Sequence, residues 1–124
     1  MSNRPLGEGK VMREGVGFGQ SPKAAAKSGP LCQAIETRRC VSANEGNLLL
    51  VIAPHAVFRD AEGWRLAGAV LEENGAAIEP GRWDVLAVAD LSYIMPTDRP
   101  FDVHKDYDAN DPRFSRDCNC KLAG

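Results

Sequence analysis

Hydrophobic positions recur with two different periods along this chain. In residues 30–39 (PLCQAIETRR), Leu31 and Ile35 share one face at helical spacing, and the closing pair of arginines suits the negative end of a helix dipole. From there onward, apolar and polar residues alternate or form short apolar runs, separated by Asn-Gly, Pro-Gly and similar turn sequences. The pattern therefore predicts one short helix followed by a series of short strands.

The predicted strands are short and closely spaced. They cover residues 39–44, 47–54, 55–60, 63–73, 82–91 and 92–101. The run NLLLVIAP fits a strand that is buried on both sides, and the strand that contains Trp64 ends at the Asn74-Gly75 turn. Short strands at even spacing favour a small barrel or a sandwich, and a barrel also removes exposed strand edges.

The two ends of the chain differ from its middle. Residues 1–29 are rich in glycine, serine and alanine without apolar spacing, so they cannot bury enough surface to offset the entropy of ordering. Residues 106–124 are polar and rich in turn-forming residues. We therefore predict a flexible arm over 1–29, one domain over 30–105 and a flexible polar tail over 106–124.

Composition narrows the function only a little. The 124 residues carry a net charge of −2, which gives no overall attraction to nucleic acid or to an anionic membrane. No apolar run approaches the roughly 20 residues of a membrane-spanning helix, and the first residues lack the apolar core of a secretion signal. We therefore expect a cytoplasmic protein without a membrane partner, whose cysteines are reduced thiols.

The order of these segments resembles the WYL domain family, in particular its small stand-alone bacterial members. The similar segments are LCQAIETRRCV, IAPHAVFR, AEGWRLAGAV, WDVLAVADLSYIMPTDRPF and DYDANDPRF, within residues 30–114. Trp64-Arg65-Leu66 stands at the position of the Trp-Tyr-Leu that names the family. The resemblance implies a five-stranded barrel of the Sm or SH3-like kind, preceded by a helix. It also implies a regulatory module that senses a ligand, with nucleic acid or a nucleotide as the leading candidate.

Two features depart from the family pattern. Residues 1–29 are too short and too rich in glycine to form the DNA-binding domain that usually precedes a WYL domain. The Arg-x-Asp of the late strand falls on Ala87 and Ala89, and Arg65 replaces the tyrosine of the name motif. Because a guanidinium is the natural partner of phosphate, the missing late-strand arginine removes the strongest reason to expect the family's ligand.

Arginines and aromatic residues nonetheless form a candidate binding surface. The candidate site for a ligand or nucleic acid comprises His55, Arg59, Trp64, Arg65, Arg82 and Trp83. Aromatic faces stack on bases and arginines contact phosphates, so the expected partner is single-stranded nucleic acid or a nucleotide. In the alternative interpretation, both tryptophans fill the core and the arginines are their solvated neighbours.

Two further patterns suggest metal ions but fit them poorly. Four cysteines lack the Cys-x-x-Cys spacing of a structural zinc site, namely Cys32, Cys40, Cys118 and Cys120. The segment DYDANDPRFSRD resembles a calcium loop, but Asp111 stands where that loop needs glycine and Asp117 where it needs glutamate. We therefore predict no metal ion and no cofactor.

The sequence carries no recognisable catalytic motif, and we predict that the protein is not an enzyme. Its two histidines, His55 and His104, lie in no nucleophile or metal motif.

Two functions remain. A module that binds nucleic acid or a nucleotide requires Arg59, Arg65 and Arg82 on one exposed face, and its binding falls with salt. A protein-interaction or assembly module pairs with another protein or with itself through exposed strand edges, and its association is insensitive to salt.

Overall fold

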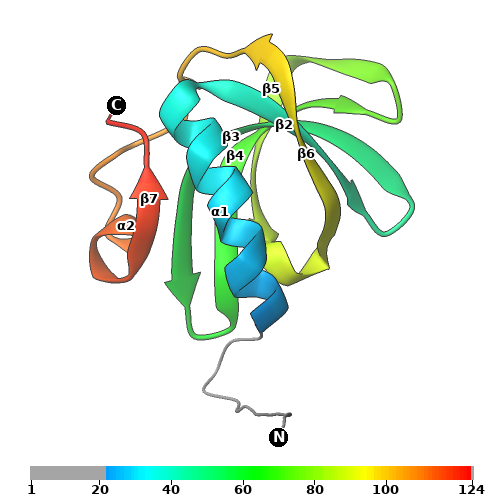
Figure 1. The fold of residues 1–124 in the computed structure, drawn as a ribbon. Helices are drawn as coiled ribbons and strands as arrows, with labels where there is room; N and C mark the ends of the chain where they lie inside the picture. The colour runs from blue at the N-terminus through cyan, green and yellow to red at the C-terminus, as the bar shows by residue number, and fades with distance from the viewer. Residues whose placement is uncertain (1–21, 124) are drawn as a thin grey trace, which may run out of the picture.

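A computed structural model describes residues 22–123, apart from the side chains of residues 22–26, 115 and 116. Its elements are α1 (Pro22–Thr37), β2 (Arg39–Glu45), β3 (Leu48–Asp60), β4 (Gly63–Glu73), β5 (Ala76–Ala87), the single turn η2 (Val88–Asp90), β6 (Leu91–Pro100), α2 (Arg113–Arg116) and β7 (Cys118–Lys121). Figure 1 shows α1 lying across the sheet, with α2 and β7 beside it. The mostly β fold with one helix before an antiparallel sheet is confirmed.

The strands form one six-stranded sheet in the order β5-β4-β3-β2-β6, and β7 pairs with β3 outside this path. All the pairings are antiparallel. The long strand β3 pairs along one edge with β2 over Leu48–Ile52 and then with β7 over Ala56–Phe58. The C-terminal strand therefore covers the part of this edge that β2 leaves open.

The sheet curls but does not close. Its two edge strands, β5 and β6, are joined by the single turn η2, and the chain from Ala87 to Leu91 can span at most about 14 Å. Two opposite edges of a sheet can be joined over so short a span only if the sheet curls round on itself. No pairing between β5 and β6 is seen in the described part of the chain, so the closed five-stranded barrel that we predicted is not confirmed.

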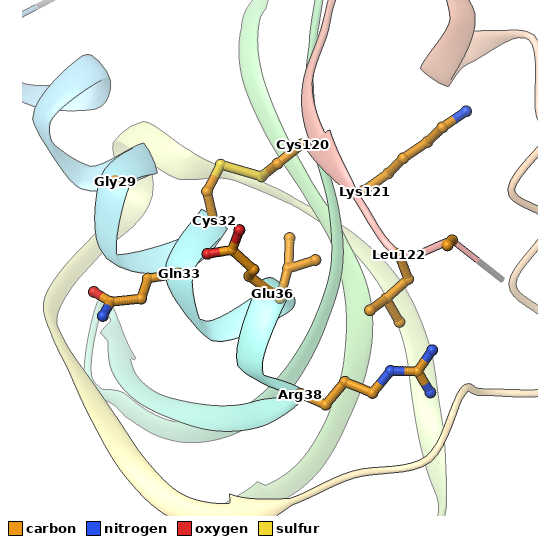
Figure 2. Close-up of a pocket in the computed structure, with 10 residues that line it drawn as sticks. Gly29, Cys32, Gln33, Glu36, Arg38, Cys120, Lys121 and Leu122 are labelled. Carbon is orange, nitrogen blue, oxygen red and sulfur yellow. A yellow bond between two sulfur atoms is a disulfide. The ribbon is translucent and has the colours of Figure 1, made fainter.

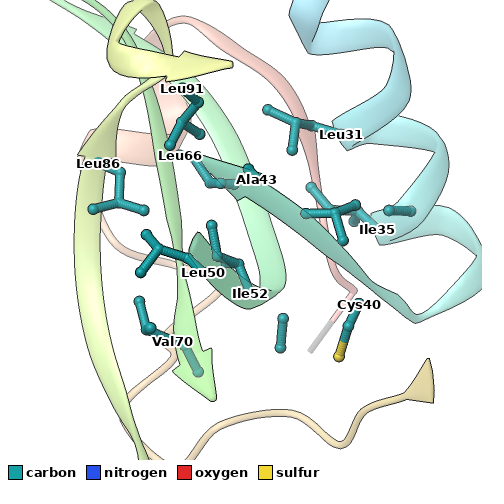
Figure 3. Packing of buried hydrophobic residues seen from close by; sticks show 14 of the residues in the cluster. Leu31, Ile35, Cys40, Ala43, Leu50, Ile52, Leu66, Val70, Leu86 and Leu91 are labelled. Atoms are coloured by element: carbon teal, nitrogen blue, oxygen red, sulfur yellow. The ribbon is translucent and has the colours of Figure 1, made fainter. Parts of the chain in front are cut away.

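The main core lies between α1 and the concave side of the sheet (Figure 3). Leu31 and Ile35 contribute the buried face of α1, as their helical spacing predicted. Strands contribute the remaining residues, among them Val41, Leu50, Ile52, Leu66, Val70, Leu86 and Leu91. At Gly68 a Cβ atom would lie 2.6 Å from the carbonyl oxygen of Ala53, so β3 and β4 can approach this closely only because residue 68 is glycine.

A second, smaller core forms under the C-terminal segment. Phe58 of β3 and Phe114 of α2 pack with ring centroids 5.2 Å apart and ring planes tilted by 57°, and both are almost fully buried. Trp83, Tyr107 and Cys118 pack against this cluster. Residues after β6 are therefore part of the packed fold.

Two boundary predictions were wrong. α1 begins at Pro22, so residues 22–29 are helical and not part of a flexible arm, and Pro30 lies inside the helix. The predicted strands 47–54 and 55–60 form one strand, β3, in which the pairing register shifts just after Pro54. Such an irregularity accommodates the missing proline N–H. The rest of the predicted arm, residues 1–21, lies outside the described residues.

The prediction of a flexible polar tail over residues 106–124 was also wrong where this segment forms secondary structure. This segment contains α2 and β7, and Phe114 and Leu122 are buried. β7 has only four residues, with alternating half-buried and exposed positions, which is too short for its periodicity to stand out in the sequence.

Candidate functional site

The three candidate arginines do not gather on one face. Arg59 lies opposite Trp64 on the neighbouring strand, whereas Arg65 follows Trp64 directly and so points to the other side of the sheet. Arg82 is paired with Val70, six residues along β4 from Trp64, which is about 20 Å along an extended strand. The common phosphate-binding face that the nucleic-acid hypothesis requires is therefore absent from this arrangement.

Each of these arginines also has a carboxylate partner. The Arg59 guanidinium lies 2.6 Å from a carboxylate oxygen of Asp117, and the Nε atom of Arg65 lies 3.1 Å from Asp60. Arg82 lies 3.2 Å from a carboxylate oxygen of Glu73. Exposed ion pairs of this kind contribute little to stability, but they neutralise the positive charge that a phosphate would need.

The two tryptophans lie on opposite faces of the sheet. Trp64 packs against the main core and lies beneath the Arg59 guanidinium, whose carbon is 5.6 Å from the ring centroid. Trp83 opposes Ala69 and packs against His104, with ring centroids 5.5 Å apart. Both rings are half-buried, and each packs at the margin of a core.

His55 is a structural residue at the centre of the molecule. Its side chain is fully buried in β3 among Trp83, Phe101 and Tyr107. Its Nδ1 atom lies 2.8 Å from the carbonyl oxygen of Ala53, and its Nε2 atom accepts a hydrogen bond from the backbone N–H of His104 at 3.0 Å. Because both nitrogens are used, His55 has no position left for a ligand.

Burial sets the charge of His55. Removal from water lowers the pKa of the His55 imidazole to about 4, although the carbonyl group of Ala53 acts in the opposite direction. The ring is therefore neutral at physiological pH. Its neutral Nε2 atom can then accept the hydrogen bond that holds the segment after β6 against β3.

A groove between α1 and β7 is a second candidate site. Figure 2 shows the Cys32–Cys120 disulfide bridging α1 and β7 at this groove. Its volume is about 730 Å³, and it is lined by Gly29, Cys32, Gln33, Ile35, Glu36, Arg38, Cys120, Lys121, Leu122 and Ala123. This volume lies within the range of small-molecule sites, and the lining combines apolar surface with a few charged groups.

Arg38 is the residue that gives this groove its chemistry. It follows α1 directly with a φ angle of 54°, in the left-handed conformation that often ends helices. Its side chain is exposed and, within residues 22–123, makes no hydrogen bond and no ion pair. The Lys121 ammonium, in contrast, donates a hydrogen bond to the carbonyl oxygen of Ala109 at 2.8 Å and extends away from the disulfide in Figure 2.

The cysteines do not all remain thiols, so our expectation of four reduced cysteines was wrong. Cys32 of α1 and Cys120 of β7 form a disulfide with a Cα–Cα distance of 5.7 Å. Cys40 and Cys118 are free, and burial raises the pKa of each thiol. The pairing joins positions 88 residues apart, and such pairing between distant cysteines cannot be read from spacing alone.

The residues of the calcium-like segment have other partners. Asp108 accepts a hydrogen bond from the backbone N–H of Asn110, Asp111 pairs with Arg113, and Asp117 pairs with Arg59. Among the described residues, no group of three or more histidine, cysteine or acidic side chains is placed to hold a metal ion. Neither helix in the same part of the chain has the length and apolar character needed to cross a membrane.

The sequence pointed to Arg38 only as a residue at the end of a helix. The wall opposite Arg38 comes from Leu122 and its neighbours, far along the chain, and the disulfide brings that wall to α1. The aromatic residues beside Arg59, Arg65 and Arg82 in the sequence favoured those arginines instead.

Comparison with known proteins found no matching family model, no similar curated protein and no matching solved structure.

Proposed function

We propose that the protein is a stand-alone WYL-like ligand-sensing module with a regulatory role, whose ligand is a small anionic molecule of the nucleotide class. The ligand binds in the groove between α1 and β7. The observation that carries the proposal is Arg38, whose exposed guanidinium has no carboxylate partner in the described chain and lines that groove. Arginine binds phosphate through two parallel hydrogen bonds.

A small ligand is favoured over a nucleic-acid strand. A strand contacts several phosphates along an extended basic surface, whereas Arg59, Arg65 and Arg82 are neutralised and separated. The groove offers one available guanidinium beside the apolar side chains of Ile35 and Leu122. This combination suits one anionic group attached to one apolar or aromatic body.

The antiparallel sheet behind a helix, with edges brought together by η2, supports the WYL-like interpretation. The replacements at Ala87 and Ala89 mean that the family's late-strand arginine cannot supply the anion contact here. The ligand site of this chain is therefore proposed on different residues from those that the sequence favoured.

We predict that adenosine monophosphate binds to the wild-type protein and that Arg38→Ala weakens the binding about tenfold or more. This factor corresponds to the loss of a hydrogen bond to a charged group. Isothermal titration calorimetry measures the change. Arg39→Ala is the matched control, because Arg39 is the adjacent exposed arginine but lies outside this groove. Equal affinities for the two variants, or no binding by the wild type, would contradict the proposal.

A second function, as an assembly module, is favoured by one specific observation. The large apolar side chains exposed in the described chain are Leu49, Tyr93 and Met95, with 48, 81 and 58 % exposure. Met95 lies opposite Ser42 of β2, and Leu49 lies opposite Asn44 of the same strand, so they share one face near the edge strand β6. Such a face suits a second copy of this chain.

If this face mediates assembly, sedimentation velocity will show a dimer whose population does not change between low and high salt. Leu49→Ser and Met95→Ser will then shift the protein to monomer, because they remove exposed apolar surface of this face without changing the charge. The exposed and distant Lys105→Ser serves as the control. A monomeric wild-type protein at all concentrations would exclude this function.

A further inference from the structure

We propose that the Cys32–Cys120 disulfide is a site of thiol–disulfide exchange with small monothiols, at which the incoming thiol becomes attached to Cys120. This inference does not depend on the proposed ligand. It rests on the position of the disulfide and on one side-chain contact that distinguishes its two sulfur atoms.

The disulfide is accessible to a small reagent. Both of its cysteines are half-buried, and both line the groove between α1 and β7. In Figure 2 the bond bridges α1 and β7 at this groove, and its two cysteines pack only at the margin of the main core. A disulfide buried in a core cannot be approached in this way, and reactivity in exchange depends on access.

Asn119 makes the two sulfur atoms unequal. Its side-chain amide nitrogen lies 3.4 Å from the Sγ atom of Cys32 and donates toward it. A donor at this position stabilises negative charge on Cys32 once the bond breaks, and the thiol with the more stable thiolate is the faster leaving group. Attack is therefore directed to Cys120, and Cys32 leaves.

The carboxylate of Glu36 opposes the stabilisation of a Cys32 thiolate by Asn119, but its effect is weaker. Glu36 lies one helical turn after Cys32, where its carboxylate disfavours a thiolate. The carboxylate is exposed, so water and salt screen its effect. The amide of Asn119, in contrast, contacts the sulfur directly, and we infer that the contact outweighs the screened charge.

Exchange begins when a monothiol RSH loses its proton to water. Its thiolate attacks the Sγ atom of Cys120, a new S–S bond forms, and the Cys32–Cys120 bond breaks. The electron pair leaves on Cys32, which then takes a proton from water in place of the proton that RSH lost. A second RSH can attack the mixed disulfide, which releases RSSR and leaves Cys120 as a thiol.

The test is exchange with reduced glutathione in the Cys118→Ser variant of the full chain, which leaves Cys40 as the buried free thiol among the described residues. Alkylation at successive times, followed by peptide mapping, shows which cysteine carries glutathione. We expect one glutathione per chain, on Cys120, while circular dichroism shows that the protein stays folded. Asn119→Ala should slow the attachment at Cys120 about tenfold, as expected for the loss of a hydrogen bond to a charged sulfur, and Glu36→Gln should accelerate it slightly.

Three results would overturn the inference. One is that the folded protein does not react, although the same disulfide reacts in denaturing urea. Another is glutathione mainly on Cys32. The third is an equal division between Cys32 and Cys120 that Asn119→Ala does not change. Because adduct position is read directly, a variant with reduced stability still reports on the direction of attack.

Discussion

At the scale of single residues, the fold depends on partners that are far apart in the chain. Arg59 and Asp117 form their contact across 58 positions, and His55 binds the backbone of His104 across 49. The buried positions Leu31 and Ile35 could be predicted because one helical face repeats locally. The partners of Arg59, Arg65 and Arg82 could not be predicted in this way, and so the sequence overstated the positive charge available near the tryptophans.

The neutral, buried His55 makes stability depend on pH in one direction. Its pKa in the folded protein is about 4, below the ordinary value of 6.5, so its contribution is complete above pH 6.5 and is lost as the pH falls toward 4. Full loss corresponds to roughly 3 kcal/mol in the free energy of unfolding. Urea unfolding at a series of pH values measures it. The His55→Gln variant, which cannot gain this proton, should show a shallower decline over the same range. Identical declines in the two proteins would show that other groups control acid stability.

At the scale of elements, β7 shows how a short segment becomes ordered by tertiary contacts. It has four residues, but it pairs with β3, is linked to α1 by a disulfide, and is followed by Leu122, whose N–H donates to the carbonyl oxygen of His55 at 2.8 Å. The longer strands β2 and β4 agreed with their predicted ranges because alternation and turn residues marked both ends. β5 began earlier than predicted, because Pro80-Gly81 looked like a loop in the sequence but lies inside the strand.

The disulfide should account for a large part of the stability of the C-terminal segment. It links cysteines that are 88 residues apart, and the chain-entropy model gives about 4–5 kcal/mol for a loop of this length. We expect the double variant Cys32→Ser and Cys120→Ser to lose stability of this order in chemical denaturation. Cys118→Ser is the control, because Cys118 takes no part in the disulfide. A double variant no less stable than the control would mean that pairing with β3 alone holds β7.

At the scale of the whole molecule, the chain is a curled antiparallel sheet with a helix in front and a folded C-terminal segment at its side (Figure 1). The fold class followed from the change of hydrophobic period and from close turns, which are local features. The groove could not be predicted from local features. Its walls come from α1 and from the last residues of the described chain, which meet only in the folded state. The proposed site therefore exists only in the folded chain.

The most direct test of this account is a backbone amide NMR titration of the wild-type protein with adenosine monophosphate. We predict chemical-shift changes that cluster around Gln33, Arg38 and Leu122 and weaken as salt is added. In Arg38→Ala they should need about tenfold more ligand, whereas in Arg39→Ala they should be unchanged. Changes that cluster instead around Trp64, Arg65 and Trp83 would return the binding site to the surface that the sequence first favoured. The absence of changes at any salt concentration would contradict a nucleotide-sensing function and would favour the assembly function.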